Sequence, residues 1–507
     1  MSTRTTANLA DLVRRAARAT PGKTALVFGD SATTWNQLDE RVSAVARGLT
    51  NLGLVAGDRV AVQLGNTPDF PACYFGVLRA GLVAVPVNIG YTGSEVSRLL
   101  ADSGALVLIT TGDGVECALG LEQPPAHLVV VSAAPAPAGA VTLADLIADD
   151  GPFDDVGGGE DLAVVLYTSG TSGRPRGAML THRALLANLE QCSQIEPPVM
   201  AADDIVLLVL PLFHVYGLNA ALGAVAWHGA TGVLVERFDP VQTLEQIRRH
   251  GVTNLVGVPA MYVAWSMLPD VGDAFTSVRL ALSGAAPLPA AVLQRVLETT
   301  GRHIFEGYGL TETAPVLTTT LMSEVARPGS IGRAIPGVEL RLIDEAGQPT
   351  EDGDPGELVV RGANLFSGYW PDGSEGPDAD GWFATGDVAL IDGDGDLSLV
   401  DRRRELILVS GFNVYPREIE EVLARHPDID EAAVLGIAHP YTGESVKALV
   451  VLRQGARLTA DDVIAFCART LARFKCPTTV EFVNGLPHSA TGKVSKGRLR
   501  EAGAATS

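Results

Sequence analysis

Residues 8–160 alternate short apolar runs with segments of helical periodicity. The apolar runs at 59–64, 83–87 and 106–110 are too short for most helices and are rich in valine and leucine, which is typical of buried strands. The segment that starts at Thr34 places apolar residues at helical spacing behind a threonine that can cap a helix. This alternation predicts parallel βαβ units.

A second series of strands and helices follows. Apolar runs at 205–210, 254–259 and 280–284 predict strands, and the last two end in glycine-bearing turns of the kind at which open α/β sheets bind ligands. From 338 to 400 the pattern changes to short alternating strands separated by tight turns, as in a small β-barrel or a distorted sheet.

The final stretch has an apolar pattern of its own and opens with a polar run that suits a hinge. It predicts helices at 416–424 and 459–471 and strands at 432–436, 447–452 and 480–483. We therefore expect an α/β fold with two domains. The first, residues 1–401, combines βαβ subdomains with a small β-barrel-like subdomain, and the second, residues 402–507, is a small mobile α+β domain.

The amino-acid composition limits the classes of protein to which the chain can belong. With 47% hydrophobic and 19% charged residues, the 507-residue chain can bury large cores, and its net charge of −21 argues against nucleic-acid binding. Its five cysteines are scattered, which favours neither a disulfide framework nor a zinc site. No apolar run is long enough to span a membrane, and the first residues lack the apolar core of a signal peptide. We expect a cytoplasmic protein without integral membrane association.

The most informative stretch is 167–177, Tyr-Thr-Ser-Gly-Thr-Ser-Gly-Arg-Pro-Arg-Gly, which lies between a predicted strand at 162–167 and a predicted helix at 181–190. Its glycines let backbone N–H groups turn toward a ligand, its hydroxyls add donors, and arginine forks fit phosphate oxygens. Such a loop can wrap a polyphosphate. A flexible surface loop is the alternative, and the spacing is not that of a Walker A loop.

With its flanks, this stretch resembles the signature of the adenylate-forming superfamily, which comprises acyl-CoA synthetases, adenylation domains and luciferases. Within this superfamily we expect the chain to resemble bacterial fatty-acid–CoA ligases most. Arg176 stands where that signature usually has lysine, which keeps the positive charge but replaces a point charge with a planar fork. The resemblance implies that Arg176 contacts phosphate during catalysis. It also implies an ATP-binding role for Thr168, Ser169, Gly170, Thr171, Ser172 and Gly173.

Residues 305–313, Phe-Glu-Gly-Tyr-Gly-Leu-Thr-Glu-Thr, resemble the adenine-and-metal loop of the superfamily. By this resemblance Tyr308 stacks on adenine, while Thr311 and Glu312 meet the α-phosphate and Mg²⁺. Thr168 is the second candidate metal ligand, and a carboxylate is a hard oxygen ligand that suits Mg²⁺. Further candidate nucleotide contacts are Glu306, Gly307, Gly309 and the turn formed by Gly284, Ala285 and Ala286.

Two more motifs follow in the expected order. Asp387, in a Thr-Gly-Asp motif, resembles the aspartate that accepts hydrogen bonds from both ribose hydroxyls. Arg402 matches a ribose-binding arginine, and Arg404 matches the hinge position, although the arginine run could equally be a solvated face.

The C-terminal stretch carries the matches that concern CoA and the catalytic lysine. Ser410 and Gly411 match the place at which the pantetheine arm of CoA enters, and Lys493 matches the lysine that bridges the substrate carboxylate and the α-phosphate. A cation there offsets charge that builds up as two anions meet. Taken alone, Lys493 would be a solvated surface lysine.

The resemblance implies an AMP-forming acid–CoA ligase that uses ATP, Mg²⁺ and CoA. A carboxylic acid attacks ATP to give an acyl-adenylate and pyrophosphate, and the CoA thiol then displaces AMP. A free-standing adenylation enzyme that loads a carrier protein is one alternative, and a non-catalytic nucleotide-binding relative is another. We expect a monomer or a homodimer.

The identity of the acid substrate is predicted from the residues expected to line its pocket, which are mostly small or apolar. By resemblance His214 gates the acid pocket, although a lone histidine is more often a satisfied core residue. The candidate pocket residues are His214, Tyr216, Gly217, Ala220, Gly307 and Val316. Only Arg237 could pair a second carboxylate. The sequence favours a medium- or long-chain fatty acid, then a hydroxycinnamate-like acid, then malonate.

Overall fold

The computed structural model describes most of the chain. The described residues are 7–119, 124–132, 135–149, 151–168, 175–323, 327–344, 346–351, 353–402, 405, 407–409, 412–439, 443–471, 473–488, 494–496 and 498–499.

The first apolar runs form a seven-stranded sheet in the order β7-β6-β5-β3-β4-β8-β9. Its neighbouring strands are parallel except for β8 and β9, which pair antiparallel, so the predicted βαβ units are confirmed. The strands are β3 (Arg59–Gln63), β4 (Val83–Pro86), β5 (Val107–Thr111), β6 (His127–Val131), β7 (Ala140–Thr142), β8 (Leu162–Thr168) and β9 (Arg176–Thr181). The helices of this part are α1 (Asp11–Ala19), α2 (Trp35–Asn51), α3 (Asp69–Arg79), α4 (Gly93–Ser103), α5 (Gly112–Leu119) and α6 (Leu143–Leu146).

Local sequence explains several helix starts. The side chains of Thr34 and Thr92 each accept a hydrogen bond from the backbone of the third helical residue, whose own side chain accepts one from the backbone N–H of the threonine. These reciprocal bonds satisfy donors that a helix start otherwise leaves unpaired. Thr181 caps α7 (His182–Ser193) in a similar way, through the backbone N–H of Ala184.

The second sheet has thirteen strands in the order β17-β18-β19-β20-β16-β15-β14-β13-β12-β10-β11-β1-β2. Its parallel part contains β1 (Thr24–Phe28), β10 (Ile205–Leu208), β11 (Thr231–Leu234), β12 (Asn254–Gly257), β13 (Leu280–Ser283) and β14 (Ile304–Gly309), and β2 (Ser31–Thr34) pairs antiparallel at one edge. The helical segments of this part are η1 (Tyr216–Gly223), α8 (Ala224–His228), α9 (Pro240–His250), α10 (Pro259–Ser266), α11 (Val271–Ala274), η2 (Phe275–Ser277) and α12 (Ala290–Thr300).

The short strands predicted from 338 to 400 continue this sheet as an antiparallel extension. They are β17 (Val338–Ile343), β18 (Gly356–Gly362), β19 (Trp382–Ile391) and β20 (Leu397–Arg402), joined to β14 through β15 (Val316–Thr319) and β16 (Ser330–Ala334). Two one-turn helices, η3 (Thr311–Thr313) and η4 (Thr320–Met322), flank β15. The extension carries the Asp387 motif to the end of the parallel strands.

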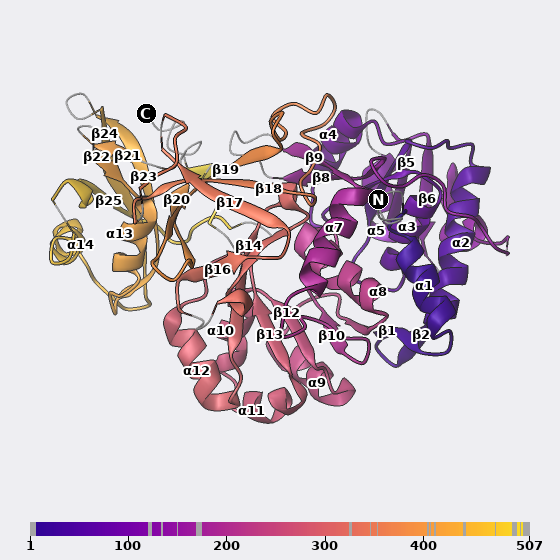
Figure 1. Cartoon of the computed structure of the whole chain (residues 1–507), viewed down its shortest axis with the longest axis horizontal. Coiled ribbons are helices and arrows are strands. Elements are labelled where there is room, and N and C mark those ends of the chain that lie inside the picture. The colour runs from indigo at the N-terminus through magenta and orange to yellow at the C-terminus, as the bar shows by residue number, and fades with distance from the viewer. Residues whose placement is uncertain are drawn as a thin grey trace.

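A five-stranded sheet forms the last part, which lies at the yellow end of the molecule beside β19 and β20 (Figure 1). Its strands are β21 (Ile407–Val409), β22 (Phe412–Val414), β23 (Ile429–His439), β24 (Gly443–Leu452) and β25 (Thr479–Phe482). Helices α13 (Pro416–Leu423) and α14 (Ala460–Cys467) and the short turn η5 (Arg473–Lys475) accompany it, and it has its own buried cluster of apolar residues.

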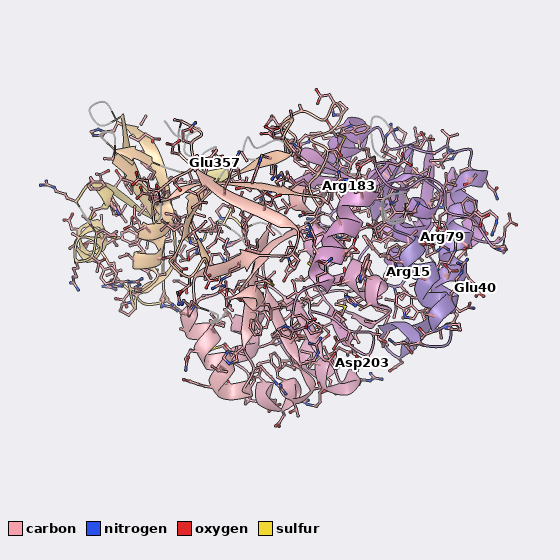
Figure 2. The ribbon with its side chains drawn as sticks, viewed as in Figure 1. Arg15, Glu40, Arg79, Arg183, Asp203 and Glu357 are labelled. Atoms are coloured by element: carbon pink, nitrogen blue, oxygen red, sulfur yellow. The ribbon has the colours of Figure 1, made fainter. Side chains whose placement is uncertain are left out.

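One buried charge ties the N-terminal helices together. Arg79 (Figure 2) is fully buried at the end of α3. Its Nη2 lies 2.6 Å from Asp39 Oδ1 and its Nε lies 3.0 Å from Asp155 Oδ1. Removing one member of such a set costs about 3–5 kcal/mol, because the other charges stay buried.

Among the described residues, no helix combines the length and apolarity that crossing a bilayer requires.

Candidate active site

The predicted phosphate loop joins two paired strands. β8 and β9 run antiparallel, with Thr168 opposite Arg176. The sequence alone predicts that Arg176 lies in the loop, whereas the structure places it at the start of β9, the strand that directly precedes α7. Antiparallel pairing with β8 holds the stretch Arg-Gly-Ala-Met-Leu-Thr in an extended conformation. Ser169, Gly170, Thr171, Ser172 and Gly173 lie outside the described residues.

Arg176 is held by two side chains from a distant segment. Its Nη1 and Nη2 donate hydrogen bonds of 2.9 and 2.7 Å to the two carboxylate oxygens of Glu375. The guanidinium carbon lies 3.6 Å from the centroid of the Tyr369 ring, within the range of a cation–π contact. The hydrogen bonds that Arg176 donates to Glu375 raise its pKa above the ordinary value.

Tyr369 links Arg176 to the predicted metal ligand. Its hydroxyl donates a 2.6 Å hydrogen bond to Glu312 Oε1. Burial, followed by the charge of Glu312, raises the pKa of Tyr369, so the phenol stays protonated and keeps donating. The structure thus brings Thr168, Arg176 and Glu312 to one place.

Few protein ligands are available there for a metal. No group of three or more His, Cys, Asp or Glu side chains suited to a metal exists in the described part of the chain. One carboxylate and one hydroxyl nevertheless fit Mg²⁺, which keeps several waters and often binds through one or two protein oxygens and substrate phosphates.

The adenine and ribose candidates meet across the second sheet. Glu306, Gly307, Tyr308 and Gly309 lie on β14, and Thr311 follows in η3. The Tyr308 hydroxyl donates a 2.6 Å hydrogen bond to Asp387 Oδ2 on β19. Asp387 is the cross-strand partner of Arg402 on β20, so the backbone brings the two ribose candidates opposite each other. The side chain of Arg402 lies outside the described residues.

The predicted turn after β13 approaches the acid side of the site. Ala285 adopts a left-handed backbone conformation, with φ of 69°. A side chain at Gly284 would place its Cβ 3.0 Å from the Tyr216 ring, so the glycine allows close packing there. Ala286 follows in the same turn.

Glu306 is a buried carboxyl at this edge of the sheet. Burial raises its pKa to about 7, opposed by the hydrogen bond that its Oε2 accepts from the backbone N–H of Leu288 and by the charge of Arg417. The carboxyl of Glu306, a candidate nucleotide contact, is therefore protonated over much of the acidic pH range.

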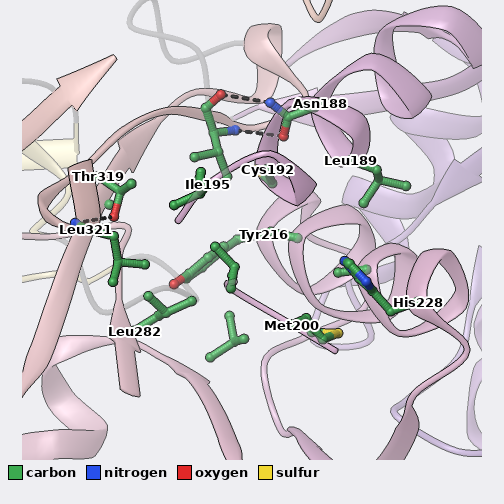
Figure 3. Close-up of a pocket in the computed structure, with 16 residues that line it drawn as sticks. Asn188, Leu189, Cys192, Ile195, Met200, Tyr216, His228, Leu282, Thr319 and Leu321 are labelled. Atoms are coloured by element: carbon green, nitrogen blue, oxygen red, sulfur yellow. Dashed lines mark hydrogen bonds between the residues drawn. The ribbon is translucent and has the colours of Figure 1, made fainter. Parts of the chain in front are cut away.

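A mostly apolar cavity of about 70 Å³ has Gly307 in its wall, and Figure 3 shows its lining. Its walls come from α7, the segment that follows α7, η1, α8 and the strands β12 to β15. The lining residues that complete it are Asn188, Leu189, Cys192, Ile195, Val199, Met200, Tyr216, Ala220, Ala224, His228, Val256, Leu282, Val316, Thr319 and Leu321. None of the described lining residues is Lys, Arg, Asp or Glu.

Four of the six predicted acid-pocket residues line this cavity, namely Tyr216, Ala220, Gly307 and Val316. His214 and Gly217 are not among its walls. The Nδ1 of His214 accepts a 3.4 Å hydrogen bond from the backbone of Tyr216. A Cβ at Gly217 would lie 2.4 Å from the carbonyl oxygen of Pro211, so the glycine lets η1 pack closely on the preceding segment.

The remaining predicted residues lie outside the described residues, namely Lys493, Arg404, Ser410 and Gly411. The neighbours of Lys493 are described: His488 and Val494 form a β-bridge on either side of the segment that carries it. Hydrogen bonds with Thr92 lower the pKa of Glu95 on α4, and the charge of Arg498 adds a smaller effect in the same direction. Arg498, which follows Lys493, therefore lies near α4 of the N-terminal part.

Comparison with known families and proteins decides the identity. Residues 13–370 match the model described as AMP-binding enzyme, and residues 418–493 match the AMP-binding enzyme C-terminal domain. The chain belongs to the AMP-binding enzyme family. It is 38% identical over 490 residues to a feruloyl-CoA synthase from Amycolatopsis, covering 96% of this chain and 97% of that protein.

Two further comparisons agree. The chain is 34% identical over 532 residues to a long-chain-fatty-acid–CoA ligase from Yersinia pestis, covering 97% of this chain and 94% of that one. ATP-bound MatB from Rhodopseudomonas palustris superimposes with a TM-score of 0.88 and 32% identity, covering 98% of this chain and 99% of that one. This AMP-binding enzyme is thus an AMP-forming acid–CoA ligase, with ATP and CoA as substrates.

Several residues of the ligase site were missed by sequence reasoning. They are Tyr369 and Glu375 beside Arg176, and Asn188, Met200 and His228 in the cavity. Helical spacing on α7 predicts that Leu189 lies on a buried face, but it cannot tell a solid core from a cavity wall. No sequence signal connects Glu375 with Arg176.

Proposed function

We propose that the acid substrate is a hydrophobic monocarboxylic acid, with a medium- or long-chain fatty acid favoured. The observation that carries this proposal is the cavity beside Gly307, whose described walls are apolar or neutral. Each buried CH₂ contributes about 0.8 kcal/mol when it leaves water. An alkyl chain gains this term along the whole cavity, whereas a second charge would lose its hydration without a partner.

The same cavity argues against malonate. Arg237, the one cation considered for a second carboxylate, is exposed and is not among the cavity walls. A dicarboxylic acid would have to place its second charge against Leu, Val and Met side chains. We therefore rank malonate last.

A hydroxycinnamate-like acid is the second candidate, because two polar groups face the cavity. The ring of His228 and the hydroxyl of Tyr216 are these groups, and both residues line its walls. Burial lowers the pKa of His228, so the neutral ring offers one donor and one acceptor. A phenolic hydroxyl could bind to either group.

ATP is proposed to lie between the two clusters described above, with phosphates beside Thr168 and Arg176, adenine on Tyr308 and ribose on Asp387. The hydrogen bond between Tyr308 and Asp387 supports this arrangement, because it brings the purine and ribose candidates within contact distance. Thr168 and Glu312 would hold Mg²⁺, which neutralises phosphate charge when bound.

The catalytic lysine is proposed to be Lys493, acting from a C-terminal domain that begins at 402 and rotates about Arg404 between the two half-reactions. The β-bridge between His488 and Val494 supports this assignment, because it holds together the two described residues that flank the lysine segment. In the first half-reaction the lysine bridges carboxylate and α-phosphate as pyrophosphate leaves. In the second, the CoA thiol attacks the acyl carbon and AMP leaves.

We also propose that the enzyme works in the cytoplasm as a monomer or homodimer, with CoA rather than a carrier protein as acyl acceptor. Cys73, Cys192, Cys467 and Cys476 are free thiols, which supports a reducing compartment.

A panel of acids tests the proposal. The enzyme is incubated with ATP, Mg²⁺ and octanoate, palmitate, ferulate or malonate, and AMP is measured with and without CoA. We expect CoA-dependent AMP formation that is fastest with octanoate or palmitate. Fastest turnover of malonate would contradict the acid assignment, and AMP formation that CoA does not increase would contradict the CoA assignment.

A further inference from the structure

The guanidinium of Arg176 already has an anionic partner in the protein. Glu375 takes both terminal nitrogens in a two-bond fork, at 2.7 and 2.9 Å. Side-chain exposure is 28% for Arg176 and 61% for Glu375, so a ligand can reach the pair from solvent.

A phosphate group would compete for those same nitrogens. Arginine binds carboxylate and phosphate in the same planar fork geometry, so one terminal edge accommodates one anion at a time. The Tyr369 ring covers one face of the guanidinium and limits how it can turn to serve two anions. Glu312, also anionic, approaches through the Tyr369 hydroxyl.

The backbone holds Glu375 in place for this contact. Its φ is 53°, a left-handed conformation that residues with a side chain rarely adopt. The segment around it is tied to the phosphate strand, since the backbone N–H of Trp370 donates a 2.8 Å hydrogen bond to the carbonyl oxygen of Gly177. The carboxylate is therefore delivered to Arg176 by the fold and not only by a flexible side chain.

We propose that Glu375 is an internal competitor of polyphosphate for Arg176. It pairs with the guanidinium between turnovers, yields it to ATP, and takes it back as pyrophosphate leaves. The inference rests on the proposed role of Arg176 as a phosphate contact. In this proposal Glu375 sets the affinity of the site for both ATP and pyrophosphate. As a result Arg176, which binds anions through two hydrogen bonds where lysine would use a point charge, does not retain pyrophosphate after the reaction.

A positioning role for Glu375 would have the opposite sign. An exposed ion pair adds little to the orientation of a side chain, whereas a carboxylate that occupies both terminal nitrogens of Arg176 must be displaced before a phosphate can bind them. Removing the carboxylate should therefore tighten polyphosphate binding.

The test is the affinity of the full-length enzyme for inorganic pyrophosphate and for ATP, measured by calorimetry without any acid. We expect Glu375→Gln to lower the Kd for pyrophosphate by ~3- to 10-fold, because pyrophosphate then no longer has to displace an exposed ion pair from Arg176. The KM for ATP should fall in parallel. A wrong acid assignment would not alter the calorimetric result.

Glu339→Gln is a matched control. Glu339 also pairs with an arginine through two hydrogen bonds, from Nε and Nη2 of Arg361 at 3.1 and 2.6 Å, and Arg361 stacks on Trp382. This variant should leave pyrophosphate binding unchanged. Equal tightening by Glu339→Gln would overturn the proposal, because it would trace the effect to net charge.

A second background shows whether the effect passes through Arg176. In Arg176→Ala, adding Glu375→Gln should leave the pyrophosphate Kd unchanged. If Glu375→Gln tightened pyrophosphate binding equally in both backgrounds, the proposed competition for Arg176 would be overturned. A weaker pyrophosphate affinity of the single variant Glu375→Gln would also overturn it, because it would mean that Glu375 positions the arginine.

Discussion

The hydroxyl of Tyr308 donates a 2.6 Å hydrogen bond to the carboxylate of Asp387. The two residues lie on β14 and β19, which belong to the same sheet but are separated in it by β15, β16 and β20. The bond fixes a carboxylate next to the ring that we expect to stack on adenine. It gives the proposed nucleotide site a defined distance between its purine and ribose contacts.

We expect Asp387→Ala to raise the KM for ATP by ~10- to 100-fold, since a hydrogen bond to a charged group contributes about 1.5–3 kcal/mol. Tyr308→Phe keeps the ring, and its effect should stay within about fivefold, the value of one ordinary hydrogen bond. Initial rates at varied ATP measure both. Equal damage in the two variants would show that ATP binding depends on the Tyr308 hydroxyl.

Arg176 should contact phosphate. We expect Arg176→Ala to lower kcat/KM for ATP by ~10- to 100-fold, the effect of losing one charge-assisted hydrogen bond. Arg176→Lys should keep most activity, because the ammonium preserves the charge. If ATP kinetics are unchanged in the alanine variant, Arg176 is a surface residue and not part of the phosphate site.

Lys493 should serve one half-reaction only. We expect Lys493→Ala to slow acyl-adenylate formation by ~10²–10³, since two anions must then meet without a bridging cation. The variant should convert supplied acyl-adenylate and CoA to thioester at nearly the normal rate. Comparable slowing of both steps would make Lys493 structural and would refute domain rotation as described.

The buried carboxyl of Glu306 predicts a pH effect on stability. Its pKa of about 7 in the folded chain exceeds the ordinary value of 4.5, so the folded state binds more protons between these values. The free energy of unfolding should therefore fall as pH rises from about 4.5 to 7, by roughly 3 kcal/mol for this group. Glu306→Gln should lose less Tm than the parent enzyme between pH 5 and pH 8. A parallel loss in both proteins would show that Glu306 is ionised when folded.

The sequence predicted the elements whose pattern is local. β8 is a continuous apolar run and α7 follows a capping threonine, so both were predicted within a few residues. β9 was missed because its first two residues, Arg176 and Gly177, favour a loop when considered alone. Pairing with β8 overrides that preference.

The site was predictable only where a motif carried it. The contact between Arg176 and Glu375 spans 199 positions, and nothing in either segment indicates it. The cavity brings Met200 and His228 together with Gly307 through the packing of α7, η1 and α8 on the sheet. Apolar periodicity predicts that such residues are buried but does not predict the space between them.

The most direct test of the central claim is kcat/KM for AMP formation across straight-chain acids from butanoate to palmitate, compared with Ala224→Phe. Ala224 lines the cavity at the start of α8, so a phenyl ring there should shorten the space. The exposed helical residue Ala101 provides a matched control, Ala101→Phe.

In the parent enzyme we expect kcat/KM to rise about fourfold per added CH₂, the equivalent of ~0.8 kcal/mol, until the cavity is filled. The optimum of Ala224→Phe should move to shorter acids, while Ala101→Phe follows the parent. A profile that does not depend on chain length, or an optimum that Ala224→Phe leaves unchanged, would contradict the assignment of this cavity to a hydrophobic acid.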